Sequence, residues 1–94
     1  MQTIKKVPVT PQYSERIPET ETMLEGVIYI SEVYDTASHL CLCGCKNLTV
    51  TPLGSEHWTL LNKEDKLTMF PSIGNYNFPC KSHYIITKGI ANFV

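Results

Sequence analysis

The sequence predicts a small, mostly β domain, antiparallel in its strand pairing and held together by one structural zinc ion. Short runs rich in β-branched and aromatic residues alternate with turn residues, all four cysteines fall into two short clusters, and no segment has the period of a long helix. A chain of 94 residues forms a single domain whose hydrophobic core is modest relative to its surface. A metal ion that links two distant segments suits a domain of this size.

The N-terminal region differs in composition from the rest of the chain. It contains Pro8, Pro11 and Pro18 and shows no sustained hydrophobic period. We therefore expect residues 1–16 to form a flexible, extended arm and residues 17–94 to form the zinc-binding β domain.

From Gly26 onward, apolar runs and turn residues predict strands in succession. The polar tip Lys63-Glu64-Asp65 and the dipeptide Lys88-Gly89 predict two tight hairpin turns. The expected strands are Val27–Val33, Asn47–Leu53, His57–Leu61, Lys66–Phe70, Tyr84–Thr87 and Ile90–Phe93.

Composition disfavours several classes of function. The formal net charge is −1, so the chain lacks the basic surface typical of nucleic-acid binding, despite the local Lys5-Lys6 pair. No run resembles a signal peptide or approaches the roughly 18 apolar residues of a membrane span. We expect a cytoplasmic protein, in which thiols stay reduced and clustered cysteines favour metal binding over disulfides.

The cysteines indicate one structural zinc site. Cys41, Cys43 and Cys45 occupy alternate positions, Cys80 lies far along the chain, and four thiolates form the full ligand set of a closed tetrahedral site. Residues two apart in a straight strand are roughly 6.5–7 Å apart, so the first three thiols can share one ion only if the chain bends, and Gly44 permits that bend.

Other arrangements of the thiols stay open. Disulfides or unligated thiols are alternatives, and the common C-x₂-C zinc spacing is absent. Cys80 and His83 form a legitimate C-x₂-H spacing, so a Cys₃His site is the chief rival to a Cys₄ site. A catalytic zinc is disfavoured, because such a site keeps an open position and usually has a carboxylate base nearby.

Five short segments of the chain form a specific combination: His39-Leu40-Cys41-Leu42-Cys43-Gly44-Cys45, Thr51-Pro52-Leu53, Trp58-Thr59-Leu60, Pro71-Ser72-Ile73-Gly74-Asn75-Tyr76-Asn77-Phe78-Pro79-Cys80 and Ser82-His83-Tyr84. Together these motifs resemble the BubE-like family of bacteria and phages, long catalogued as a domain of unknown function. The resemblance covers about residues 17–94, with Lys46 where glycine usually follows the third cysteine and Tyr76 where tryptophan is usual.

The resemblance implies a serine-type peptidase or isopeptidase, similar to a deubiquitinase, that processes or removes a bacterial ubiquitin-like protein. Members of this family occur beside ubiquitin-like conjugation genes in bacterial defence operons, so the expected partner is a ubiquitin-like protein or its conjugates. The alternative is a non-catalytic zinc-binding adaptor that docks onto conjugation or phage proteins through its arm or an exposed β edge.

A catalytic pair can also be predicted from strand register. If the strand of His39 and Cys41 lay antiparallel to the strand that begins at Cys80, with Cys41 opposite Cys80, then His39 would face Ser82. Ser82 would act as nucleophile and His39 as base. His39 has two other interpretations, as a hydrogen-bond donor to a zinc thiolate or as a ligand in place of Cys41.

Other polar and aromatic residues have competing interpretations. Ser72 is the second candidate nucleophile, and Asn75 can either orient a catalytic histidine or serve a turn. The aromatic residues Trp58, Tyr76 and Phe78 can line a groove for an extended tail, although aromatic residues in a small domain usually pack in the core.

Overall fold

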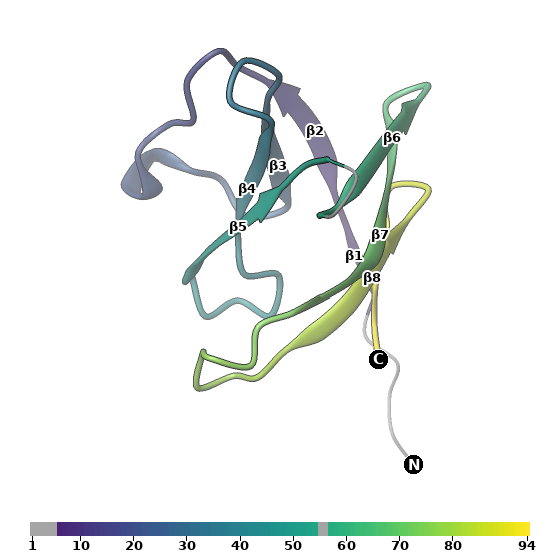
Figure 1. The fold of residues 1–94 in the computed structure, drawn as a ribbon. Coiled ribbons are helices and arrows are strands. Elements are labelled where there is room, and N and C mark those ends of the chain that lie inside the picture. Colours follow the sequence, from purple (N-terminus) through teal and green to yellow (C-terminus); the bar gives the residue numbers. More distant parts are fainter. Residues whose placement is uncertain (1–5, 55–56) are drawn as a thin grey trace.

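The computed structural model describes residues 6–54 and 57–94, and strands dominate this part of the chain (Figure 1). The mostly β fold class is therefore confirmed. A short 3₁₀ helix, η1, spans Thr20–Thr22. The strands are β1 (Lys6–Pro8), β2 (Thr10–Tyr13), β3 (Val27–Ser31), β4 (Thr36–Leu40), β5 (Leu48–Pro52), β6 (Thr59–Lys63), β7 (Lys66–Gly74), β8 (His83–Thr87) and β9 (Ile90–Phe93).

The strands form two sheets. One has the order β1-β9-β8-β7-β6 and the other the order β2-β3-β4-β5. Every pair of neighbouring strands is antiparallel except β2 and β3, which are parallel. No helix in the described part of the chain has the length and apolar character needed to cross a membrane.

Two predicted hairpins form, each through a two-residue turn. Glu64 and Asp65 between β6 and β7 have φ values of 54° and 62°, and Lys88 and Gly89 between β8 and β9 have φ values of 48° and 80°. Positive φ at both central residues characterises the type I′ turn, whose twist matches that of the flanking strands. These turns fix the register of the hairpins β6–β7 and β8–β9.

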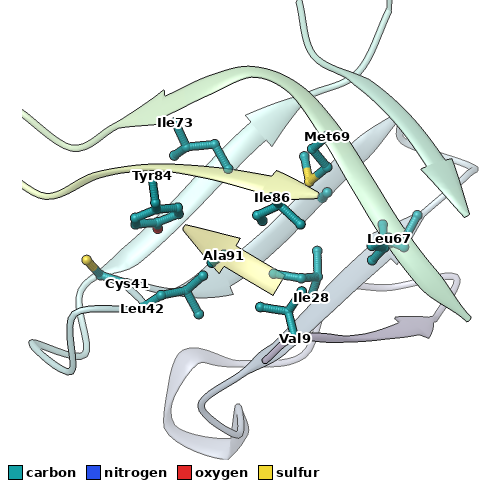
Figure 2. Close-up of a cluster of buried hydrophobic side chains, with 12 residues drawn as sticks. Val9, Ile28, Cys41, Leu42, Leu67, Met69, Ile73, Tyr84, Ile86 and Ala91 are labelled. Carbon is teal, nitrogen blue, oxygen red and sulfur yellow. The ribbon is translucent and has the colours of Figure 1, made fainter. Parts of the chain in front are cut away.

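The main hydrophobic core lies between the two sheets (Figure 2). In Figure 2, Ile28 of the four-stranded sheet lies near Ile86, Leu67 and Met69 of the five-stranded sheet, and Tyr84 lies beside Cys41. The buried members are Val9, Ile28, Ile30, Ala37, Cys41, Leu42, Leu67, Met69, Ile73, Tyr84, Ile86 and Ala91.

Residues 1–16, expected to form an arm, contribute β1 and β2, whereas residues 1–5 lie outside the described part of the chain. β1 pairs with β9, and β2 pairs with β3. Val9 between them is buried and donates its N–H to the Gly89 carbonyl at 2.9 Å. Pro11 fits in β2 because this strand pairs along one edge only, so an amide hydrogen is dispensable there.

Strand β4 contains His39 and was expected only in the register argument, not from its hydrophobic pattern. Its sequence, Thr-Ala-Ser-His-Leu, lacks alternating hydrophobicity, yet Ser38 and His39 are almost completely buried. β4 lies between β3 and β5 in the sheet, so its backbone groups are paired on both sides. Inside the domain, His39 Nε2 lies 2.7 Å from the Tyr84 hydroxyl, whereas its buried Nδ1 has no hydrogen-bond partner among the described residues.

Candidate metal centre and active site

The four cysteines converge on one point. Their Sγ atoms all lie within 4.8 Å of one another, with 3.4 Å between Cys41 and Cys43, 3.7 Å between Cys41 and Cys80, and 3.6 Å between Cys45 and Cys80. All four are free thiols, and these separations are far longer than the roughly 2.05 Å bond of a disulfide. The structure therefore brings together all four sequence-predicted ligands.

The loop after β4 bends as the sequence requires. The Gly44 N–H donates to the Cys41 carbonyl at 3.1 Å, and Gly44 has φ 97°, a value that other residues rarely adopt. Lys46 also has a left-handed φ, of 64°, which accounts for the glycine expected at this position from the family resemblance. The turn returns Cys45 toward Cys41, as expected.

The thiol geometry fits a tetrahedral metal ion. Four sulfurs at about 2.3 Å from a central Zn²⁺ lie about 3.8 Å apart, close to the separations found here. His83 is not part of the cluster, because its Nε2 atom contacts the Ser72 hydroxyl. The residues present can thus supply four thiolate ligands, and the predicted metal-binding cluster is formed.

Polar groups around the thiols favour their ionised form. The Asn47 side-chain amide donates to Cys45 Sγ at 3.2 Å, and Ser82 Oγ lies 3.1 Å from Cys41 Sγ and 3.5 Å from Cys80 Sγ. Without a metal, the Ser82 hydrogen bond lowers the pKa of Cys80 to about 6, whereas burial raises the pKa of Cys43 to about 12. A bound dication would favour the thiolate at all four positions, with Ser82 as a donor.

A buried hydrogen-bond network extends from Ser82 into the interior. The Asn75 Nδ2 group donates to Ser82 Oγ at 3.0 Å and to the Tyr84 hydroxyl at 3.1 Å, and Thr49 donates to Asn75 Oδ1 at 3.1 Å. The Tyr84 hydroxyl lies 2.7 Å from His39 Nε2. The Asn75 side chain thus links the cysteine cluster to His39 through Tyr84, while its backbone carbonyl accepts the Phe78 N–H at 3.1 Å in the turn after β7, as the turn interpretation expected.

The strand pairing from which the His39–Ser82 pair was predicted is wrong. The strand of His39, β4, pairs with β3 and β5, whereas β8 pairs with β7 and β9 in the other sheet. Cys41 and Cys80 meet through loops at one end of the two sheets. The hydrogen bonds of His39 and Ser82 run to Tyr84, Asn75 and the thiols, so their catalytic role stays a prediction.

A different serine and histidine lie in direct contact. Ser72 Oγ in β7 is 2.6 Å from His83 Nε2 in β8, and both residues are half-buried. Their neighbours Ile73 and Tyr84 are buried in the core, so Ser72 and His83 face the outer side of the five-stranded sheet. A hydrogen-bonded serine and imidazole open to solvent have the geometry of a nucleophile and its base.

An irregularity in β7 adjoins Ser72. Met69 pairs with Ile86 and Ile73 pairs with Tyr84, so four residue steps on β7 oppose two on β8. The extra residues bulge from the ladder between these pairs, and bulges are frequent beside active sites because they redirect a side chain. Beyond the bulge, Gly74 pairs with His83, which places Ser72 diagonally across from the imidazole.

The exposed ring of Tyr76 and a cleft lie beside the Ser72–His83 pair. The Tyr76 ring is 63% exposed, and its centroid lies 5.7 Å from that of His83. The ring lies against Gly74 so closely that a Cβ atom there would meet it at 2.5 Å. Beyond Tyr76 is a cleft of about 180 Å³ between β5 and the segment after β7, which Trp58 and Phe78 also line.

Sequence reasoning found Ser72 and His83 separately but not as a pair. Ser72 was the second candidate nucleophile, and His83 was weighed as a metal ligand. Their pairing depends on the hairpin from β7 to β8, which the Asn75 N–H closes by donating to the Ser82 carbonyl at 2.8 Å. A hairpin assigned to the segment between Ile73 and Tyr84 would have revealed it.

Comparison with known proteins gives a family. A family model described as "Bacterial ubiquitination-like system serine protease (BubE)" matches residues 13–94, which include the thiol cluster and the Ser72–His83 pair. No curated protein and no solved structure matches the chain. Because the match spans most of the sequence and agrees with the motifs noted above, the chain belongs to the BubE family.

Proposed function

We propose that this protein is a serine peptidase in which Ser72 is the nucleophile and His83 the general base. The 2.6 Å contact between Ser72 Oγ and His83 Nε2 carries the proposal. The Ser72 hydroxyl can donate its proton to Nε2 when His83 has its proton on Nδ1. The family description supplies the reaction class, a serine protease of a bacterial ubiquitination-like system.

The proposed reaction is acyl transfer through a covalent intermediate. Ser72 Oγ attacks the carbonyl carbon of the scissile amide while His83 Nε2 accepts the hydroxyl proton. His83 returns that proton to the leaving nitrogen as the carbon–nitrogen bond breaks. A water molecule then attacks the Ser72 ester with His83 again as base, which releases the acid and restores the serine.

The predicted pair of Ser82 and His39, which lies in the interior, is less suited to this reaction. His39 is fully buried, and desolvation lowers its pKa to about 4, so the imidazolium form required during proton transfer is strongly disfavoured. Ser82 is 8% exposed and its hydroxyl contacts the thiol of Cys41, so little of this serine is open to a substrate carbonyl. Ser82 is better explained as a support of the cysteine cluster, and His39 as a residue of the core.

The four cysteines are proposed to hold one structural Zn²⁺. When bound, the ion would cross-link the loop after β4 to the turn before β8 and thereby support the β8 end that positions His83. The substrate is proposed to be a bacterial ubiquitin-like protein or its conjugates, cleaved beyond the C-terminal tail. Reduced thiols and the metal cluster suit a cytoplasmic location.

Cleavage of a fusion tests the assignment of the nucleophile. A ubiquitin-like protein from a bacterial conjugation operon, extended by a short C-terminal tail, is incubated with wild type, Ser72→Ala and Ser82→Ala, each checked for its metal content and folding. Wild type and Ser82→Ala should cleave the fusion and react with a fluorophosphonate probe, whereas Ser72→Ala should do neither. The nucleophile would instead be Ser82 if Ser72→Ala stayed active while metal-loaded Ser82→Ala lost both cleavage and probe labelling. If wild type, Ser72→Ala and Ser82→Ala all bound the fusion without cleaving it, the adaptor function would be favoured.

A further inference from the structure

On the edge of β5 that faces away from β4, the Pro52 carbonyl accepts the Trp58 N–H at 3.0 Å, whereas the backbone groups of Leu48 and Val50 have no partner among the described residues. Cys41 donates its N–H to the Asn47 carbonyl and Leu53 donates to Asp35, so the odd-numbered residues of this segment pair with β4. Hydrogen bonding alternates along an antiparallel pair, and the N–H and C=O groups of Leu48 and Val50 therefore point the other way. Within the described chain, β5 is the last strand of its sheet.

The end of β7 offers a second free edge. Asn75 donates its N–H to the Ser82 carbonyl, so Asn75 and Ile73 pair with β8 and the backbone of Gly74 points away from it. The strand on that side, β6, pairs with β7 only as far as Phe70. The N–H and C=O groups of Gly74 are thus directed toward the open side of β7, two residues from Ser72.

Both edges border the same cleft. Its lining includes Leu48, Val50 and Gly74, with Tyr76 at the end near His83. The side chains of Leu48 and Val50 are 38% and 49% exposed although both are apolar. None of the residues that line the cleft is charged.

We infer that this cleft binds the C-terminal tail of the substrate as an added β-strand, an inference that rests on the proposed peptidase function. An extended peptide that pairs with Leu48 and Val50 would satisfy their free backbone groups, the recognition mode of β-augmentation. The same peptide would pass Gly74, whose N–H can donate to the peptide, and reach Ser72. Because the cleft leads to the Ser72–His83 pair, the peptide that binds in it is the substrate.

The size of the cleft sets a side-chain preference. About 180 Å³ is well below the roughly 300–1,000 Å³ of sites that hold drug-sized ligands, so the cleft suits backbone and small side chains. The Tyr76 ring over Gly74 narrows it further at the end near Ser72. The substrate class is therefore an uncharged, extended tail with small residues next to the scissile bond.

Proline substitution tests the added strand. Val50→Pro removes an outward N–H, and Pro52 already occupies an equivalent position on this strand, so the native ladder should be kept. The control Asn62→Pro removes an outward N–H from the edge strand β6, outside the cleft. The substrate probe is an acetylated pentapeptide that ends in two glycines and carries a fluorogenic coumarin amide.

We expect Val50→Pro to lower kcat/KM for this peptide at least tenfold, mainly through KM, while Asn62→Pro stays within about twofold of wild type. Fluorophosphonate labelling of Ser72 should be unchanged in Val50→Pro, because the small probe does not use the cleft. Replacing the two glycines with leucines should lower kcat/KM at least tenfold in wild type. Equal kcat/KM in wild type and folded Val50→Pro would overturn the inference.

Binding separates failure of the inference from failure of the proposed function. A fluorescein-labelled copy of the peptide, without the coumarin, is titrated with Ser72→Ala and with Ser72→Ala/Val50→Pro, and anisotropy is recorded. Tighter peptide binding by Ser72→Ala than by Ser72→Ala/Val50→Pro supports the added strand, even if wild type proves inactive and is not labelled by the fluorophosphonate. Absence of binding by the single variant, or equal affinity in the two, refutes the tail site whatever the activity.

Discussion

Two serine–histidine regions occupy opposite environments in this domain. Ser82 and His39 lie inside, where a network through Asn75 and Tyr84 separates them, whereas Ser72 and His83 touch on the outer side of the five-stranded sheet. The first region has the thiols as neighbours and the second has solvent and a cleft. The comparison shows how burial and hydrogen-bond partners distinguish a serine suited to a structural role, Ser82, from one suited to act as a nucleophile, Ser72.

Removal of the metal should have the largest effect, because the cysteine cluster adjoins the interior region and also supports the β8 end that positions His83. Structural zinc contributes on the order of 10–16 kcal/mol in small domains, comparable to or larger than the typical stability of about 5–15 kcal/mol of a whole protein. We expect the purified protein to hold one zinc per chain by elemental analysis and to unfold on chelation, as followed by circular dichroism. Cys41→Ser should unfold or lose the ion, since Cys41 is a buried ligand.

The outcome that would contradict this assignment is specific. A metal-free protein with an unchanged melting temperature would show that the thiol cluster has no structural ion. Retention of zinc by Cys41→Ser with loss by His83→Ala would move the site to Cys43, Cys45, Cys80 and His83.

Substitution of His83 should give the next largest effect and should leave the interior intact. His83→Ala removes the proposed base, and general bases contribute on the order of 10²–10⁴ in rate. We expect a loss of that size in kcat with one zinc per chain retained. The matched variant His39→Gln should keep most activity; the reverse result would return catalysis to the interior pair.

Substitution of Ser82 should have a moderate effect on stability. Ser82→Ala removes an acceptor of the Asn75 side-chain amide and a hydrogen-bond donor to the Cys41 thiolate. A buried polar group left without a partner lowers the free energy of unfolding by about 1–3 kcal/mol. The measurement is urea denaturation of the zinc-loaded protein, followed by fluorescence. As a control, Ser72→Ala should change the free energy of unfolding by much less, and an equal loss in both would remove the distinction between the two regions.

The effect that is smallest near neutral pH tests the state of His39. Because burial lowers the pKa of His39 from 6.5 to about 4, the unfolded chain binds a proton between these values that the folded chain does not. The stability of the folded state is therefore retained above pH 6.5 and falls toward pH 4, by up to about 1.4 kcal/mol per pH unit.

The control variant for this measurement is His39→Gln, which keeps an acceptor for the Tyr84 hydroxyl. Acid also protonates zinc thiolates, but that contribution is common to both proteins. The difference in unfolding free energy between wild type and His39→Gln should thus change with pH between 6.5 and 4. A difference independent of pH would mean that His39 titrates normally in the folded protein.

Local patterns predicted the positions of two hairpins and the convergence of the four cysteines. The polar tip Glu64-Asp65 and the dipeptide Lys88-Gly89 mark the turns, and Gly44 permits the bend that brings the thiols together. The hydrophobic pattern did not predict strand β4, because its buried Ser38 and His39 are polar residue types. The register of Ser72 and His83 depends on a bulge and a hairpin, which no local pattern encodes.

The pairing of the N-terminal strands bears on where this domain begins. The family match starts at residue 13, the last residue of β2, yet β1 covers an edge of β9 and β2 covers an edge of β3. A recombinant fragment that starts at the family boundary would leave both edges bare and remove Val9 from the core. Open edges of this kind favour pairing between molecules, so such a fragment is expected to self-associate more strongly than the full chain.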